Sequence, residues 1–137
     1  MIDIPKEIVG DISEFSQEWV NEYAVASGDH NPIHIDPQYA AATPFKATIV
    51  HGMLMFGVLA EMLAGQFGEN WVRGSTLKVR FRAPIYVGTI VIPRAKLKSD
   101  SIESGVRVAE YGVTCSDDQG IIFVDGTARI EWAQRIT

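Results

Sequence analysis

A carboxylate, an amide and an imidazole lie close together in the segment Gly28-Asp29-His30-Asn31-Pro32-Ile33-His34. A second short motif, Val50-His51-Gly52-Met53, stands at the head of an almost wholly apolar run. An imidazole ionises near neutral pH, so a histidine beside a carboxylate suits general acid–base catalysis. A glycine at the start of a helix presents unpaired backbone N–H groups, which favour negative charge. Together, the two motifs predict proton transfer beside a backbone oxyanion site.

The same residues also have structural interpretations. Asp29 could cap a turn, since Gly-Asp-x-Asn-Pro is good turn chemistry, and Asn31 could serve the backbone alone. His30 and His34 have the i,i+4 spacing of helical zinc motifs. Pro32 breaks the helix that would align them, so we expect no metal site.

Length, charge and cysteine content limit the class of protein. A chain of 137 residues fits one domain over residues 1–137, and its net charge of -5 disfavours a nucleic-acid partner. The single cysteine, Cys115, indicates a reducing compartment and, lying in an apolar run, is expected to be buried and inert. Residues 1–10 do not resemble a signal peptide, and no apolar run reaches the roughly 18 residues of a spanning helix. We expect a cytoplasmic protein with no membrane partner.

Three segments of the first half have helix signals. Ser16 is a candidate N-cap for a helix over residues 17–26, and Asp36-Pro37 resembles the start of a short helix through about residue 42. Between them, Pro32 predicts a structured loop over residues 29–34. The segment 51–65 is apolar on every face except at Glu61, so the rest of the chain has to wrap it.

The second half of the sequence is typical of β-strands. Runs rich in Val, Ile and Thr, separated by turn residues, cover 76–82, 89–98, 106–116 and 121–132. Their spacing predicts an antiparallel sheet with one buried face. The expected fold class is α+β, with one strongly curved sheet around a long buried helix.

With these motifs and elements, the chain resembles the MaoC-like dehydratase family, which includes the (R)-specific enoyl-CoA hydratases. The resemblance rests on Tyr23-x-x-x-Ser27-Gly28-Asp29-x-Asn31-Pro32-x-His34, on Ala40, and on the motif from Ile49 to Met53. The segments Val79-Arg80-Phe81-Arg82-Ala83-Pro84 and Val87-Gly88 extend it, so that residues 13 to 100 are covered well. The family implies a hot-dog fold. Some members carry a serine on the central helix where this chain has Ala60, so this chain lacks that polar side chain.

The resemblance implies reversible addition of water to a trans-2-enoyl thioester of CoA or acyl carrier protein, giving the (R)-3-hydroxyacyl thioester. Asp29 and His34 would be the acid–base pair, Asn31 would orient them, and the Gly52 N–H would contact the thioester oxygen. This chemistry, of the hydro-lyase type EC 4.2.1, needs no cofactor. It would place the protein in fatty acid metabolism.

Further substrate contacts are expected from Pro32, His51 and Met53 in the motifs. Arg80 and Arg82 are also expected to contact substrate, since they alternate with apolar residues, together with Lys78, in the strand-like run 76–82. The two arginines could hold CoA phosphates or the phosphate of a carrier protein's pantetheine arm, or could equally be a solvated strand face. His51 could instead have a structural role, as a helix-capping or packing residue. A hot-dog acyl thioesterase and a noncatalytic acyl-thioester-binding subunit of a dehydratase complex are the alternative functions. Because a single hot-dog sheet exposes edge strands, we expect a homodimer or a higher homo-oligomer.

Overall fold

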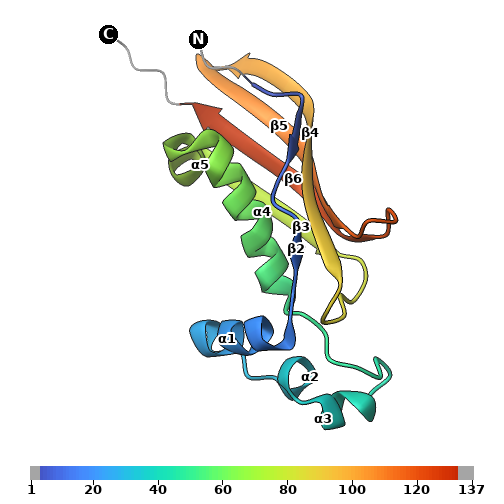
Figure 1. Cartoon of the computed structure of the whole chain (residues 1–137). Coiled ribbons are helices and arrows are strands. Elements are labelled where there is room, and N and C mark those ends of the chain that lie inside the picture. Colours follow the sequence, from blue (N-terminus) through green and yellow to red (C-terminus); the bar gives the residue numbers. More distant parts are fainter. Residues whose placement is uncertain (1–3, 133–137) are drawn as a thin grey trace.

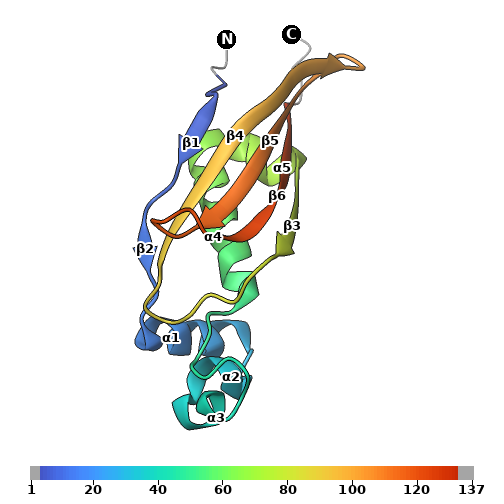
Figure 2. The ribbon, with the colours of Figure 1, turned by 90° about the vertical axis from the view of Figure 1, so that its right-hand side faces the viewer.

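An antiparallel sheet curves over one side of a long helix, as Figures 1 and 2 show from two directions. The structure is a computed structural model that describes residues 4–132. The sheet order is β1-β4-β5-β6-β3, and β2 also pairs with β4. The strands are β1 (Glu7–Val9), β2 (Ser13–Glu14), β3 (Ser75–Phe81), β4 (Ile90–Glu103), β5 (Val106–Ser116) and β6 (Ile122–Trp132).

The helices divide into two groups. The long helix α4 packs against the sheet and continues into α5, whereas α1, α2 and α3 lie together beyond one end of the sheet (Figure 1). Their bounds are α1 (Gln17–Ser27), α2 (Pro32–Ile35), α3 (Pro37–Ala41), α4 (Gly52–Phe67) and α5 (Glu69–Gly74). Within residues 4–132, none of these helices is long and apolar enough to cross a membrane.

One tight hairpin organises the sheet. Strands β4 and β5 are joined through Ser104 and Gly105, whose φ angles are 49° and 78°. A two-residue turn with both φ values positive matches the right-handed twist of the strands that it connects. Pro93 lies inside β4 opposite Cys115, at the gap between β1 and β2 where its missing N–H leaves no ladder bond unmade.

The core lies between one face of α4 and the concave face of the sheet. Every fourth residue of α4 from Met55 to Phe67 is buried, and these side chains pack with Tyr111, Ile130 and others of β5 and β6. The opposite stripe of α4 behaves differently, because Met53 and Glu61 are exposed. The described chain therefore buries the helix on one face only, which is less than its all-round apolar sequence predicts.

The predicted α+β architecture and its four long strands are confirmed. The short strands β1 and β2 and the helix α5 were not predicted, since two or three paired residues leave no periodic signal in the sequence. The predicted loop over residues 29–34 is partly wrong. Pro32 takes the first position of the one-turn helix α2, where its missing N–H costs nothing.

Candidate active site

The end of α1 sets the position of Asp29. Gly28 closes this helix with φ 77°, a left-handed conformation that glycine adopts without strain, and its N–H donates to the Ala24 carbonyl. The N–H of Asp29 then donates to the Ser27 hydroxyl at 3.2 Å. The chain therefore leaves the helix abruptly, and Asp29 lies in the connection between α1 and α2.

Side-chain caps stabilise the turn that follows. A carboxylate oxygen of Asp29 accepts from the N–H of Asn31 at 3.2 Å, and the Asn31 amide oxygen accepts from the N–H of Ile33 at 3.1 Å. Asn31 is thus the N-cap of α2, which carries His34. The local sequence favours this arrangement because Asp, Asn and Pro each suit the position that they occupy.

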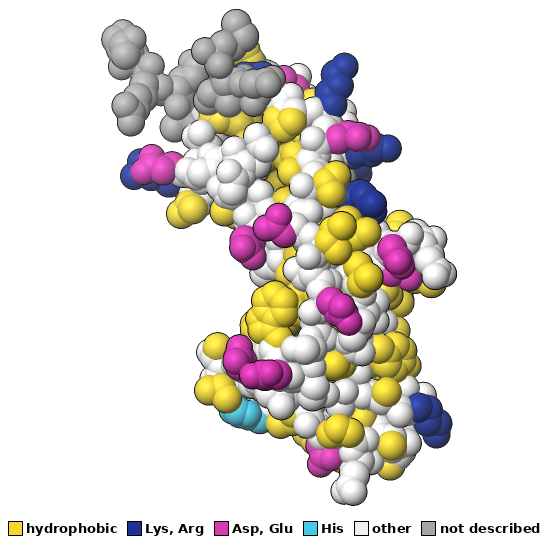
Figure 3. All heavy atoms as spheres, viewed as in Figure 1, with side chains coloured by type: hydrophobic (Ala, Val, Ile, Leu, Met, Phe, Trp, Pro, Cys, Tyr) yellow, Lys and Arg dark blue, Asp and Glu magenta, His cyan; other side chains and the backbone are white. Residues whose placement is uncertain are grey.

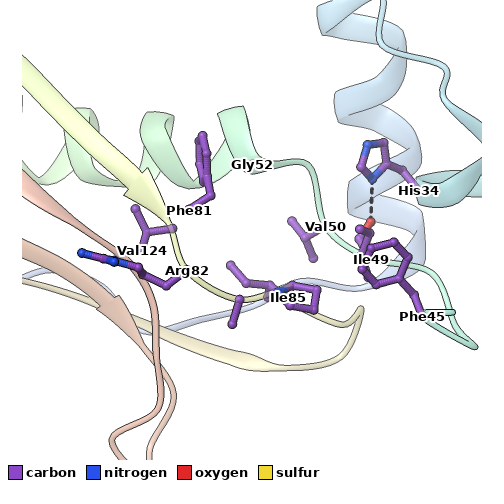
Figure 4. A pocket seen from close by; sticks show the side chains of 11 residues that line it. His34, Phe45, Ile49, Val50, Gly52, Phe81, Arg82, Ile85 and Val124 are labelled. Atoms are coloured by element: carbon purple, nitrogen blue, oxygen red, sulfur yellow. Dashed lines mark hydrogen bonds between the residues drawn. The ribbon is translucent and has the colours of Figure 1, made fainter.

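A backbone carbonyl determines the tautomer of His34. Its Nδ1 lies 2.8 Å from the carbonyl oxygen of Ile49, as the dashed line in Figure 4 shows. A carbonyl can only accept, so Nδ1 carries the proton and the neutral ring has its lone pair on Nε2. His34 therefore has the tautomer required for Nε2 to act as a general base.

The free nitrogen of His34 faces the carboxylate of Asp29. The distance from Nε2 to Oδ2 is 3.8 Å, which is longer than a direct hydrogen bond. The side chains of His34 and Asp29 are 12% and 51% exposed, so solvent reaches both. A water beside the pair can reach both atoms at ordinary hydrogen-bond lengths.

Beneath this pair lies a buried second histidine. His51 is 1% exposed, its ring stacks on that of His34 with centres 3.9 Å apart, and its Nε2–H donates to the Asp29 carbonyl at 3.1 Å. Burial lowers the pKa of His51, which favours the neutral ring. With the proton on Nε2, the buried Nδ1 is an acceptor without a hydrogen-bond partner among residues 4–132.

Gly52 is the first residue of α4, directly after His51. The end of a 16-residue helix presents backbone N–H groups and the positive end of the helix dipole. A Cβ at position 52 would lie 3.0 Å from the Phe81 ring, so a larger residue here would require the half-exposed Phe81 side chain to shift. The group that approaches Gly52 closely is thus a side chain of the protein itself, the ring of Phe81.

His34 and Gly52 both line one cavity of about 330 Å³ (Figure 4). Its walls are mainly apolar and come from the segment 45–52, the end of β3 with the loop after it, and β6. The other lining residues are Phe45, Ile49, Val50, Phe81, Arg82, Ala83, Pro84, Ile85 and Val124. Asp29 is not among them, so the Asp29/His34 pair lies at the edge of the cavity.

The predicted substrate-binding residues fall in different places. Arg82 lines the cavity, and its Nε donates to a carboxylate oxygen of Asp125 at 3.0 Å. Arg80 points to solvent on β3, Met53 is exposed on α4, and Pro32 begins α2. None of these three lines the cavity, and His51 is buried beneath His34. Roles for them in substrate binding stay predictions.

Asp29, His34 and His51 also form a cluster of potential metal ligands. One donor atom from each lies within 4.8 Å of the others. Hydrogen bonds to carbonyls already engage His34 Nδ1 and His51 Nε2, and the two rings stack at 28°. Stacked rings direct their in-plane lone pairs side by side rather than toward one point, so this arrangement fits a metal ion poorly.

A partly buried polar link behind His34 was not predicted from the sequence. The Gln17 side-chain amide donates to the His34 carbonyl at 2.8 Å, and its oxygen accepts from the Thr48 hydroxyl at 2.7 Å. This link joins α1, α2 and the segment before α4. Its members are far apart in sequence, so no local pattern indicates it. Cys115 is buried as expected, and burial raises the pKa of its thiol to about 12.

This chain belongs to the MaoC-like dehydratase family. The family model for the MaoC like domain matches residues 7–116. The 3-hydroxyacyl-thioester dehydratase Z of Mycobacterium tuberculosis is 35% identical over 121 residues, which are 83% of this chain and 74% of that protein. The peroxisomal multifunctional enzyme type 2 of Mus musculus is 38% identical over 87 residues, but the match spans only 12% of that longer enzyme.

Solved structures agree with this assignment. The (R)-hydratase from A. caviae involved in PHA biosynthesis has a TM-score of 0.73 and 27% identity, with 93% of this chain and 95% of that chain covered. The predicted family, the hot-dog fold and the hydratase or dehydratase class of enzyme are therefore confirmed.

Proposed function

We propose that this protein reversibly adds water to a trans-2-enoyl thioester and forms the (R)-3-hydroxyacyl thioester, with Asp29 and His34 as its acid–base pair. The observation that carries this proposal is the geometry of His34. The Ile49 carbonyl holds its Nδ1, and its Nε2 lies 3.8 Å from the Asp29 carboxylate, at the edge of a cavity that Gly52 also lines. The names of the relatives support the same reaction and the same (R) configuration of the product.

One water between Asp29 and His34 supplies both added groups. As its oxygen bonds to C3 of the enoyl chain, the pair takes up one proton and then delivers a proton to C2. The C2–C3 double bond becomes a single bond, so the atoms of one water are fully accounted for. General acid–base assistance of this kind contributes about 10²–10⁴-fold to a rate.

Negative charge develops on the thioester oxygen during this addition. The backbone N–H of Gly52, at the positive end of α4, is our candidate donor to that oxygen. Loss of such a donor costs about 3–4 kcal/mol of transition-state stabilisation, which is comparable with the acid–base contribution. The proposed scheme uses no metal and no redox cofactor.

His51 and Asn31 act in this scheme as positioning residues. His51 supports the ring of His34 from beneath and holds the backbone of Asp29, while Asn31 caps the helix that carries His34. Arg82, at the cavity wall, is placed to meet the polar part of the substrate. An acyl chain suits the apolar walls of the cavity.

We also propose that the working enzyme is a homodimer and that residues 1–137 form a single domain. β3 ends the sheet order, and its outer edge pairs with no other strand of the described chain. Phe81 is 54% exposed although it lines the cavity, and α4 keeps an exposed stripe. A second copy would cover these surfaces. The cytoplasmic location stays a prediction.

The absorbance of the conjugated thioester in crotonyl-CoA tests the proposed reaction directly. Purified protein should remove this absorbance and form 3-hydroxybutyryl-CoA without releasing free thiol. Release of CoA without a hydroxyacyl product would favour the thioesterase alternative. No reaction over a range of acyl lengths, with CoA and carrier-protein substrates, would favour the noncatalytic subunit.

A further inference from the structure

We infer that the outer face of the sheet, which faces away from α4, carries a binding site for the phosphate groups of a free CoA thioester. This inference rests on the proposed function and identifies the form of its substrate. The site is a trough of about 670 Å³ between β3 and β4, which we call the basic trough. Its lining residues are Lys78, Val79, Arg80, Arg82, Lys96, Lys98, Gly112, Val113, Thr114, Asp125, Gly126 and Thr127.

The register of the strands produces the trough. One row across the sheet reads Lys78, Thr127, Gly112 and Lys96, and the next reads Arg80, Asp125, Thr114 and Arg94. Each row has small or short residues on the central strands β5 and β6 and a long cation at both ends. The floor is therefore low and both walls are basic.

The charge of the trough contrasts with that of the chain. Five cations and a single carboxylate line it, whereas the whole sequence has a net charge of -5. Arg82 pairs with that carboxylate, Asp125, and Lys96 pairs with Glu7 at 3.6 Å. Lys78 and Lys98 form no ion pair with any residue in the described range 4–132. Figure 3 shows basic side chains gathered along the upper sheet side of the molecule, with acidic ones more widely scattered.

The neighbouring row of this sheet face, by contrast, contains a cation that is neutralised by carboxylates. Arg129, one row beyond Lys78, contacts the carboxylates of Glu103, Glu110 and Glu131 at 2.6, 3.4 and 3.2 Å. The cation of this row is therefore neutralised, whereas Lys78, Arg80 and Lys98 in the trough form no ion pair with any residue in the range 4–132. Lysine and arginine clusters of this kind recognise phosphate through charge-assisted hydrogen bonds.

Arg82 connects the trough to the catalytic cavity, because it lines both. The four residue steps from Lys78, on β3, to Arg82, just after it, extend roughly 13 Å. CoA has a long uncharged arm between its sulfur and its phosphates. When the thioester group of a CoA substrate lies near Gly52, the CoA phosphates can therefore extend past Arg82 and lie in the trough.

The test combines a binding and a kinetic measurement on the full chain. Lys78→Gln with Lys98→Gln removes two cations that lie outside the catalytic machinery, and Arg73→Gln on α5 removes one exposed charge elsewhere as a control. We expect the double variant to raise the Kd for CoA, and the KM for crotonyl-CoA, about tenfold at low salt with little change in kcat. Crotonyl-pantetheine, which lacks phosphates, should be hydrated equally well by the wild type and by the double variant.

A steric variant checks the floor of the trough. A Cβ at Gly112 would lie 2.8 Å from the flexible end of Lys98, whereas at Gly126 it would lie 1.9 Å from the Lys78 carbonyl oxygen. Gly112→Val is therefore the tolerable change, and it should weaken CoA binding without removing any charge. Thermal unfolding of this variant verifies that the sheet is intact.

Three results would overturn the inference. The first is an unchanged Kd for CoA in the double variant. The second is an equal loss of hydration activity toward crotonyl-CoA and crotonyl-pantetheine. The third is a loss of activity only toward a carrier-protein thioester, which would assign the trough to binding an acidic protein surface. Trough-dependent binding of CoA without any hydration would instead leave the trough standing and reject the proposed function.

Discussion

The imidazoles of His34 and His51 stack with their ring centres 3.9 Å apart, yet their surroundings differ. The Nε2 of His34 faces the solvent-exposed carboxylate of Asp29, whereas His51 is buried and donates to the Asp29 backbone. One ring is therefore placed for proton transfer and the other for support. The difference predicts separate effects when each residue is replaced.

Replacement of Asp29 by Asn should lower kcat for crotonyl-CoA by about 10²–10⁴-fold, because the amide cannot take up a proton from water. The fold should persist, since the side chain is half exposed and the amide oxygen can still accept from the Asn31 N–H. His34→Ala should have a similar effect. Initial rates measure the loss, with the exposed neighbour His30→Ala as the control. Near wild-type turnover in either variant would show that the assigned pair is wrong.

Asn31 provides a test that separates capping from chemistry. Asn31→Ala should lower the free energy of unfolding by about 1 kcal/mol, because the Ile33 N–H loses its acceptor. Asn31→Asp retains an acceptor at this position and should restore most of the stability. Chemical denaturation of the three proteins gives the comparison. If activity falls in both variants while stability recovers in Asn31→Asp, then Asn31 acts on the substrate as well.

Burial of His51 predicts a pH dependence of stability. Its folded pKa lies below the ordinary value of 6.5, so in the window between the two values the unfolded chain binds a proton that the folded chain does not. The free energy of unfolding should therefore be highest above pH 6.5 and decrease as the pH falls through this window. His51→Gln keeps an N–H donor but has no charge, so it should flatten this decrease.

Denaturation curves between pH 7.5 and 5 measure this effect, with exposed His30→Gln as the matched control. Hydrogen bonds from Arg107 and Arg129 lower the pKa values of Asp100 and Glu103. These two carboxylates therefore lose their contribution to the free energy of unfolding only near or below about pH 4, which is close to their ordinary pKa. Their effect lies outside the window. An identical pH profile for wild type and His51→Gln would contradict the prediction.

The free edge of β3 predicts association of the chain. Sedimentation velocity at micromolar concentration should give the mass of at least two copies, because an uncovered edge strand and the uncovered stripe of α4 favour pairing. Activity per chain should then fall on dilution below the dissociation constant of the dimer. A stable and fully active monomer would show that the open cavity needs no second copy.

Local patterns in the sequence predict much of this molecule. Strand periodicity identifies β3 to β6, the caps Ser16 and Asp36 mark the starts of α1 and α3, and the two motifs bring Asp29, His34 and Gly52 to one region. These features depend on residues close together in the chain, which is why they can be predicted.

Contacts between distant residues were not predicted. The Ile49 carbonyl that fixes the His34 tautomer, the stacking of His51 and the link through Gln17 each join segments at least 15 residues apart. The basic trough likewise depends on the register between β3, β4 and the strands between them. The sequence pattern alone shows only the alternating cations of β3.

In the proposed mechanism, one water held between Asp29 and His34 adds both of its parts to the same face of the enoyl thioester. Hydration of crotonyl-CoA in D₂O, followed by chiral chromatography and NMR of the product, measures both stereocentres at once. We expect (R)-3-hydroxybutyryl-CoA with deuterium at C2 added syn to the oxygen at C3. An (S) product, or deuterium added anti to the oxygen, would contradict this mechanism even if hydration were fast.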